Sequence, residues 1–333
     1  MVEKTRQANL ELLRIIAMIF IMLGHSYIRL VHNGQEGVFG GSLFWRSLMS
    51  AIVTSGVGVF IAISGWFGIR FKLQSLTKYL FLVYFTLFLI YGLAVAFKIT
   101  NFSVQGVLIS FGFADGYWFV LGYLGLFLIS PLLNMFIEHA SKKDFQILLL
   151  SYFVFQSYVS WLSGWYNYYD GYSIIMFAGI YLSAAYVRKY PIKWIEQRAS
   201  ILWIINILAI AVIATLSMWK FGHAGRQIRD DNPLIIFAGI LMLLSFKKLT
   251  FHSKIVNWLA ASSFAVYLIH YSPFVYPYLM KGMRYLYYHF DGMIYGVILL
   301  IALLVVFFVC TLFDQLRIFC WKIVQPLFDS KKV

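Results

Sequence analysis

An arginine and a histidine stand in the first apolar segment of this chain, where ionisable side chains are rare. Between Arg14 and His25, no residue can carry a charge. An ionisable group within a membrane span is costly, and its presence indicates function by default. On a regular helix, eleven residues turn by about 1100° and rise by about 16 Å. We therefore expect Arg14 and His25 on one face of a transmembrane helix, at two depths of a polar path.

The composition places the whole chain in a membrane. It is 62% hydrophobic and 12% charged, whereas soluble domains carry about 25% charged residues. Apolar runs close to the roughly 20 residues that span a bilayer recur along the chain, without the alternating pattern of a β-barrel. The sequence predicts an all-α integral membrane protein of about ten transmembrane helices. The predicted spans cover about 9–30, 47–69, 78–97, 117–137, 145–163, 172–187, 201–219, 233–247, 255–279 and 293–318. The eighth is short, and Pro273 and Pro277 interrupt the ninth.

The distribution of basic residues predicts the orientation. Of the 27 Lys and Arg residues, 18 fall in segments on the side of the N-terminus, 8 fall on the other side and Arg14 lies within a span. This excess is the positive-inside rule, and it predicts that both termini are cytosolic. Topology explains the net charge of +14 without a nucleic-acid partner. The bilayer is the expected partner, and the cytoplasmic membrane of a bacterium is the expected location.

The domain prediction is a single membrane-embedded domain over 1–333, with a short cytosolic tail from about 319. No small-residue cleavage site follows the first apolar run, so we expect that run to remain in the protein. Cys310 and Cys320 are about 15 Å apart on a helix, which is too far for a disulfide. Their spacing does not match a metal site, and we expect no bound metal.

Three further groups of residues are candidates for chemistry. Small residues in the second span, Ser64 among them, suit close helix packing. The basic residues that follow it either anchor the helix at the interface or bind phosphates of an anionic cofactor. Tyr117 and Trp118 open the fourth span, where aromatic residues commonly form an interfacial belt. Tyr267 and His270 share a helix face; His270 either lines the same cavity as His25 or is bonded to a backbone carbonyl. The basic residues are Arg70, Lys72 and Lys78.

Five stretches together resemble the acyltransferase-3 family of bacterial membrane O-acyltransferases. They are Glu11-Leu12-Leu13-Arg14 with His25 eleven residues after the arginine, Phe60-Ile61-Ala62-Ile63-Ser64-Gly65-Trp66, Tyr117-Trp118-Phe119-Val120, Ser130-Pro131-Leu132-Leu133-Asn134, and Ser263-Phe264-Ala265-Val266-Tyr267-Leu268-Ile269-His270. The chain departs from the family at Ile61, Ala62 and Trp66, but these changes are apolar or aromatic. The resemblance covers the membrane domain from end to end.

The resemblance implies transfer of an acyl group, usually acetyl, from cytosolic acetyl-CoA to a hydroxyl of an extracytoplasmic glycan or a small hydroxylated acceptor. Acyl-CoA would be a co-substrate, with no permanently bound cofactor. A hydroxyl needs a base as it attacks the thioester, and a histidine titrates near neutral pH. We expect His25 to be that base and Arg14 to position the CoA. A covalent acyl-histidine is not indicated.

Three questions stay open at this stage. An acidic residue such as Glu36 or Asp115, next to the motif-bearing spans, is a candidate partner that orients His25, and the sequence does not choose one. Aromatic residues between 158 and 172 form either an interfacial belt or a platform for stacking sugars. The alternative function is a transporter or flippase of a glycan precursor, because interrupted helices and buried charge also occur in transporters. Consumption of acyl-CoA separates the two functions.

Overall fold

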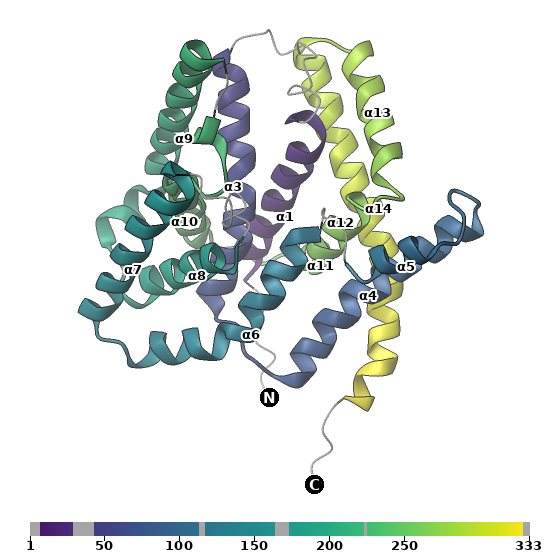
Figure 1. Ribbon diagram of the computed structural model, residues 1–333, viewed down its shortest axis with the longest axis horizontal. Helices are drawn as coiled ribbons and strands as arrows, with labels where there is room; N and C mark the ends of the chain where they lie inside the picture. Colours follow the sequence, from purple (N-terminus) through teal and green to yellow (C-terminus); the bar gives the residue numbers. More distant parts are fainter. Residues whose placement is uncertain (1–6, 29–42, 113–116, 164–172, 223–224, 329–333) are drawn as a thin grey trace.

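The computed structural model describes residues 7–28, 43–112, 117–163, 173–222 and 225–328. Within these ranges the chain is built from helices and contains no strand (Figure 1). The helices are α1 (Ala8–Leu23), which continues as the π-helix η1 (Gly24–Ile28), α3 (Leu43–Phe67), α4 (Leu73–Ala96), α5 (Val104–Ser110), α6 (Trp118–His139), α7 (Lys142–Gln156), which continues as η3 (Ser157–Leu162), α8 (Ile174–Lys189), α9 (Lys193–Phe221), η5 (Gly225–Ile228), α10 (Pro233–Lys247), α11 (Lys254–Ala261), α12 (Ser263–His270), α13 (Tyr276–His289), α14 (Gly292–Val324) and η6 (Gln325–Leu327).

The architecture confirms an all-α membrane protein. Among the described residues, seven helical segments are long and apolar enough to cross a membrane: Ala8–Ile28, Leu43–Phe67, Leu73–Ala96, Trp118–His139, Lys142–Leu162, Lys193–Phe221 and Gly292–Leu327. The predicted spans at 172–187 and 233–247 correspond to α8 and α10, of 16 and 15 residues. The number of ten spans and the cytosolic termini remain predictions.

The predicted ninth span, 255–279, is not one helix. It consists of α11 and α12, which meet at Ser262, followed by a break at residues 271–275 and then α13. Proline cannot donate a backbone hydrogen bond and clashes with the preceding turn, so Pro273 ends the helix. Pro277 is tolerated because it lies in the first turn of α13. The break at Ser262 has no proline and was not predicted.

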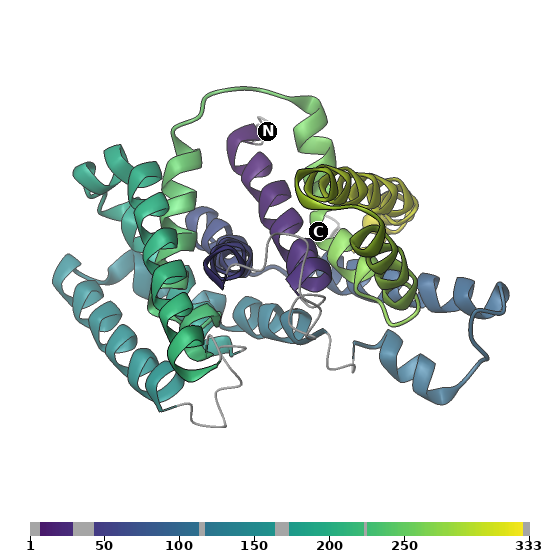
Figure 2. The same cartoon turned by 90° about the horizontal axis from the view of Figure 1, so that it is seen from above.

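Helices α1 and α3 form the centre of the molecule. Helix α3 packs against α1, α8, α9 and α10, and α1 also packs against α11, α12 and α14, as Figures 1 and 2 show. Glycine allows the close approach of α3 to α1, since a Cβ on Gly56 would lie 2.9 Å from the backbone oxygen of Ala17. Peripheral helices such as α9 and α14 expose large apolar side chains along their length, Ile205 and Val309 among them. This arrangement suits a bundle surrounded by lipid.

The first helix leaves regular α-helical geometry just before His25. The five residues of η1 follow Leu23 directly, and the Ser26 hydroxyl donates to the backbone oxygen of Met22 at 2.7 Å. A Cβ on Gly24 would lie 2.9 Å from a methyl of Val53, so glycine fits this turn against α3. Single π-helical turns within α-helices are rare and occur frequently at functional sites. The 3.6-residue period used to relate Arg14 to His25 therefore does not extend as far as His25.

Candidate active site

Arg14 is oriented by a carboxylate on its own helix. Its Nη1 lies 2.6 Å from Oε2 of Glu11, one turn earlier, and the two side chains are 26% and 9% exposed. A charge-assisted hydrogen bond of this kind is short and directional. Glu11 was not among the predicted site residues, although its i,i+3 spacing to Arg14 was visible in the sequence.

A cavity of about 570 Å³ lies beside Arg14. Its lining includes the end of α3 and the start of α4, which lie on the side of the molecule where α14 ends (Figure 1). It is enclosed by α1, the end of α3, the start of α4, α6 and the junction of α11 with α12. Arg14, Arg70 and Lys78 line it, and none of the described residues that line it is acidic. The cavity therefore favours an anionic guest. Lys72 precedes α4, is exposed and is not among the lining residues.

Ser64 and a group of aromatic rings form the inner wall of this cavity. The Ser64 hydroxyl donates to the backbone oxygen of Phe60 at 3.1 Å and lies 3.1 Å from the hydroxyl of Tyr123. The rings of Phe119 and Phe264 are 5.9 Å apart. They are followed by Tyr267, whose ring centroid lies 5.9 Å from each of them and 6.3 Å from that of His25. A series of ring contacts thus connects the lining of the cavity to His25.

His25 and His270 meet although 245 residues separate them in the sequence. Nδ1 of His25 lies 3.0 Å from Nε2 of His270, and Nδ1 of His270 lies 2.7 Å from the backbone oxygen of Val266. His270 is therefore bonded to a backbone carbonyl, and it also contacts His25. Whether the two rings line one cavity stays a prediction. The His270 ring is fully buried, at the end of α12 just before the chain breaks. Both histidines were candidates from the sequence, which could not show that they touch.

These two contacts determine which ring nitrogens carry protons when both rings are neutral. A backbone oxygen accepts only, so Nδ1 of His270 is the protonated nitrogen and Nε2 is its acceptor. His25 must then donate from Nδ1, which leaves Nε2 of His25 as its basic nitrogen. Whether one ring nitrogen of a histidine carries a proton is commonly determined by the hydrogen bond that the other ring nitrogen makes. The arrangement can accept a proton at Nε2 of His25.

Two tyrosines that the sequence did not single out complete the surroundings of His25. The ring of Tyr271 stacks on His25 with centroids 4.0 Å apart, and the hydroxyl of Tyr276 donates to the backbone oxygen of His25 at 2.6 Å. Both lie beside the proline-bearing break after α12, which was the available signal. Tyr117 reaches the backbone oxygen of Leu268 at 3.4 Å.

The remaining candidates have less direct placements. Trp118 packs on Phe119 and Phe177, with centroids 5.8 and 6.0 Å away. Glu36 and Asp115 lie outside the described residues, so the structure does not relate them to His25.

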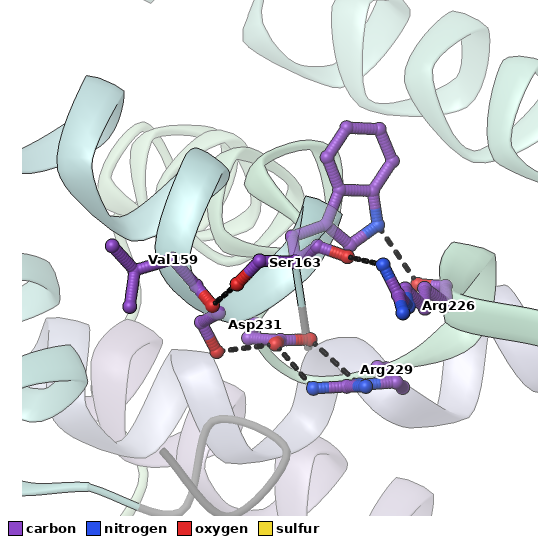
Figure 3. Close-up of polar contacts among 7 residues, drawn as sticks. Val159, Ser163, Arg226, Arg229 and Asp231 are labelled. Atoms are coloured by element: carbon purple, nitrogen blue, oxygen red, sulfur yellow. Dashed lines mark hydrogen bonds and ion pairs between the residues drawn. The ribbon is translucent and has the colours of Figure 1, made fainter. Parts of the chain in front are cut away.

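A second polar cluster joins η3 to the connection between α9 and α10 (Figure 3). Asp231 accepts from the Ser160 hydroxyl at 2.5 Å and from both Nε and Nη2 of Arg229, at 3.1 and 2.6 Å. Trp161 donates from its indole to the backbone oxygen of Arg226, and Nη1 of Arg226 donates to the backbone oxygen of Trp161. Trp161 belongs to the predicted aromatic belt or sugar platform, and the structure gives it a protein partner.

Comparison with known proteins gives one match. The family model of the acyltransferase-3 family, described as an acyltransferase domain, matches residues 7–313. No curated protein and no solved structure matches the chain. The matched range begins just before α1 and ends within α14, and it includes the cationic cavity and both histidines.

Proposed function

The chain belongs to the acyltransferase-3 family, and from this membership we propose that it transfers an acyl group, in the first instance acetyl, from cytosolic acyl-CoA to a hydroxyl of an extracytoplasmic glycan or similar acceptor. One observation carries the proposal. Helix α1 places Arg14 in a cationic cavity, and its π-helical continuation places His25 in contact with His270. On this proposal, one central helix holds both the donor site and the base.

The cavity supports binding of the donor. The nucleotide end of CoA carries several phosphates, and guanidinium and ammonium groups are the side chains that bind them. Arg14, Arg70 and Lys78 supply three such groups around one cavity. The excess of Lys and Arg predicts that this side faces the cytosol, where acyl-CoA is found.

His25 supports the chemical step. As the acceptor oxygen attacks the thioester carbon, its proton passes to Nε2 of His25. The bond between carbon and sulfur then breaks, the acyl group remains as an ester, and the proton leaves with the thiol of CoA. General-base catalysis of this kind contributes about 10²- to 10⁴-fold to a rate. His270 holds the tautomer that makes Nε2 basic, and is in this sense a positioning residue.

The test is turnover of acetyl-CoA by the purified protein in nanodiscs, with and without crude envelope glycan. Wild type is compared with His25→Ala, Arg14→Ala and the control His139→Ala, whose ring is exposed at the end of α6. We expect free CoA from wild type and from the control, loss of turnover with retained CoA binding in His25→Ala, and weakened CoA binding in Arg14→Ala. A wild-type protein that neither binds nor consumes acyl-CoA refutes the proposal and favours the transporter or flippase.

A further inference from the structure

The short segment between α3 and α4 brings Arg70 to the cavity. Helix α3 ends at Phe67, and Gly68 has φ +78°, a left-handed conformation that glycine adopts without strain. The N–H of Gly68 donates to the backbone oxygen of Ser64 at 2.9 Å. Gly68, Ile69 and Arg70 all line the cavity. The position of Arg70 therefore depends on how the residue before it is held.

Both backbone polar groups of Ile69 are bound by side chains from other helices. Its N–H donates to the hydroxyl of Tyr181 on α8 at 2.8 Å, and its oxygen accepts from Nδ2 of Asn134 on α6 at 2.7 Å. The Tyr181 hydroxyl in turn donates to Oδ1 of Asn134 at 2.6 Å, which closes a ring of three hydrogen bonds. Ile69 is 8% exposed and Tyr181 is fully buried. Little water can compete for the bond between the Ile69 N–H and Tyr181, whereas the two bonds of Asn134 are partly buried.

Helices α3 and α8 also approach each other closely at this place. A Cβ on Gly65 would lie 2.3 Å from the backbone oxygen of Tyr181, so the two backbones are in direct contact. Arg188, further along α8, donates to the backbone oxygen of Trp66. Helix packing on both sides thus fixes the ring of hydrogen bonds, as a precise binding group requires.

We infer that Asn134 and Tyr181 are positioning residues that hold Arg70 for the phosphates of the donor. This inference rests on the proposed function, because it assumes that the cationic cavity binds CoA. A backbone fixed one residue before Arg70 lowers the ordering cost when the guanidinium binds a phosphate. The inference gives a role to Asn134, the last residue of the motif Ser130-Pro131-Leu132-Leu133-Asn134. A ring of hydrogen bonds that served folding alone would not affect the binding of phosphates.

The test compares binding of CoA with binding of pantetheine, which lacks phosphates, to the full chain in nanodiscs. Tyr181→Phe removes the acceptor of the Ile69 N–H and the donor to Asn134. The control Tyr186→Phe, on the same helix, removes a hydroxyl that accepts from Gln146 at 2.9 Å. Of the two bonds that Tyr181→Phe removes, the one to the Ile69 N–H holds the backbone before Arg70. We therefore expect the Kd for CoA to rise about 3- to 10-fold, the range for one hydrogen bond. The Kd of Tyr181→Phe for pantetheine and the Kd of Tyr186→Phe for CoA should not change. In turnover, Tyr181→Phe should affect KM for acetyl-CoA rather than kcat.

The decisive comparison is made in an Arg70→Ala background. If Tyr181 acts through Arg70, Tyr181→Phe causes no further loss of CoA binding there. An additional loss of the same size refutes the inference, as does unchanged CoA binding by Tyr181→Phe in the otherwise wild-type chain. Asn134→Ala should give the same pattern, and it carries the test if Tyr181→Phe does not fold. A wild-type protein that binds CoA no more tightly than pantetheine instead refutes the donor site of the proposed function.

Discussion

Replacing His270 tests the relation between the two histidines most directly. In His270→Leu, the Nδ1–H of His25, which is partly buried, loses its acceptor at 3.0 Å. An unsatisfied buried donor costs about 1–3 kcal/mol. The substitution also removes the preference for the tautomer with a basic Nε2. If the lost bond acts in the transition state, kcat falls by about 5- to 150-fold, at about 1.36 kcal/mol for each factor of ten.

Glutamine at this position separates hydrogen bonding from shape. The amide oxygen of His270→Gln can accept near the position of Nε2, so we expect kcat closer to wild type than in His270→Leu. The assay is release of CoA from acetyl-CoA at saturating acceptor, with thermal unfolding measured alongside. His139→Gln is the matched control, because His139 makes the same type of bond to a backbone oxygen but is exposed. Turnover of His270→Leu within twofold of wild type would refute the reasoning, and so would equal losses in the leucine and glutamine variants.

Three further predictions concern stability in detergent, measured as thermal unfolding. Gly65→Ala places a Cβ 2.3 Å from a backbone oxygen of α8 and should cost about 1–3 kcal/mol, whereas Gly58→Ala, which meets nothing within 4 Å, should be tolerated. Equal effects would contradict the packing argument. Burial raises the pKa of Asp230, in the connection between α9 and α10, to about 7. The folded state thus holds a proton that the unfolded state releases near the ordinary aspartate pKa of 3.8, so stability falls as pH rises between these values. Asp230→Asn should flatten that dependence, and an unchanged slope contradicts it. Asp314→Ala breaks the buried ion pair with Arg317 and should lower the free energy of unfolding by about 3–5 kcal/mol. Glu196→Ala breaks the more exposed pair with Lys247 and should cost about 0–1 kcal/mol. The reverse order would contradict the burial argument.

The lengths of the apolar runs predicted the long helices but not their ends. The span predicted at 201–219 belongs to a helix that begins at Lys193, and the last helix continues to Val324, beyond its predicted end at 318. An apolar run reports the part of a helix in lipid, whereas the backbone hydrogen bonds continue into the polar ends. The tail predicted from about 319 is therefore helical at its start.

The candidate site was predictable in its residue types but not in its contacts. The basic cluster after α3 predicted either interfacial anchoring or phosphate binding, and two of its three members, Arg70 and Lys78, line the cavity with Arg14. The position of Lys72 depends on how the chain turns into α4, which composition does not report. The contact between His25 and His270 depends on the π-helical turn and on tertiary packing, for which the sequence around Gly24 carries no periodic signal.

The position of α1 explains how one helix could serve both sides of a transfer reaction. From Arg14 to Leu23 the helix is regular, so its rise separates the cavity from the π-helical turn by roughly 14 Å. The rings of Phe119, Phe264 and Tyr267 lie between the cavity and this turn and are packed against one another. On the proposed function, the thioester end of the donor must pass these rings to reach His25, while the phosphates remain with the cations. If these rings part for the pantetheine arm and close around it, they exclude water from the thioester. Acylation of a hydroxyl at His25 is then favoured over hydrolysis of the thioester.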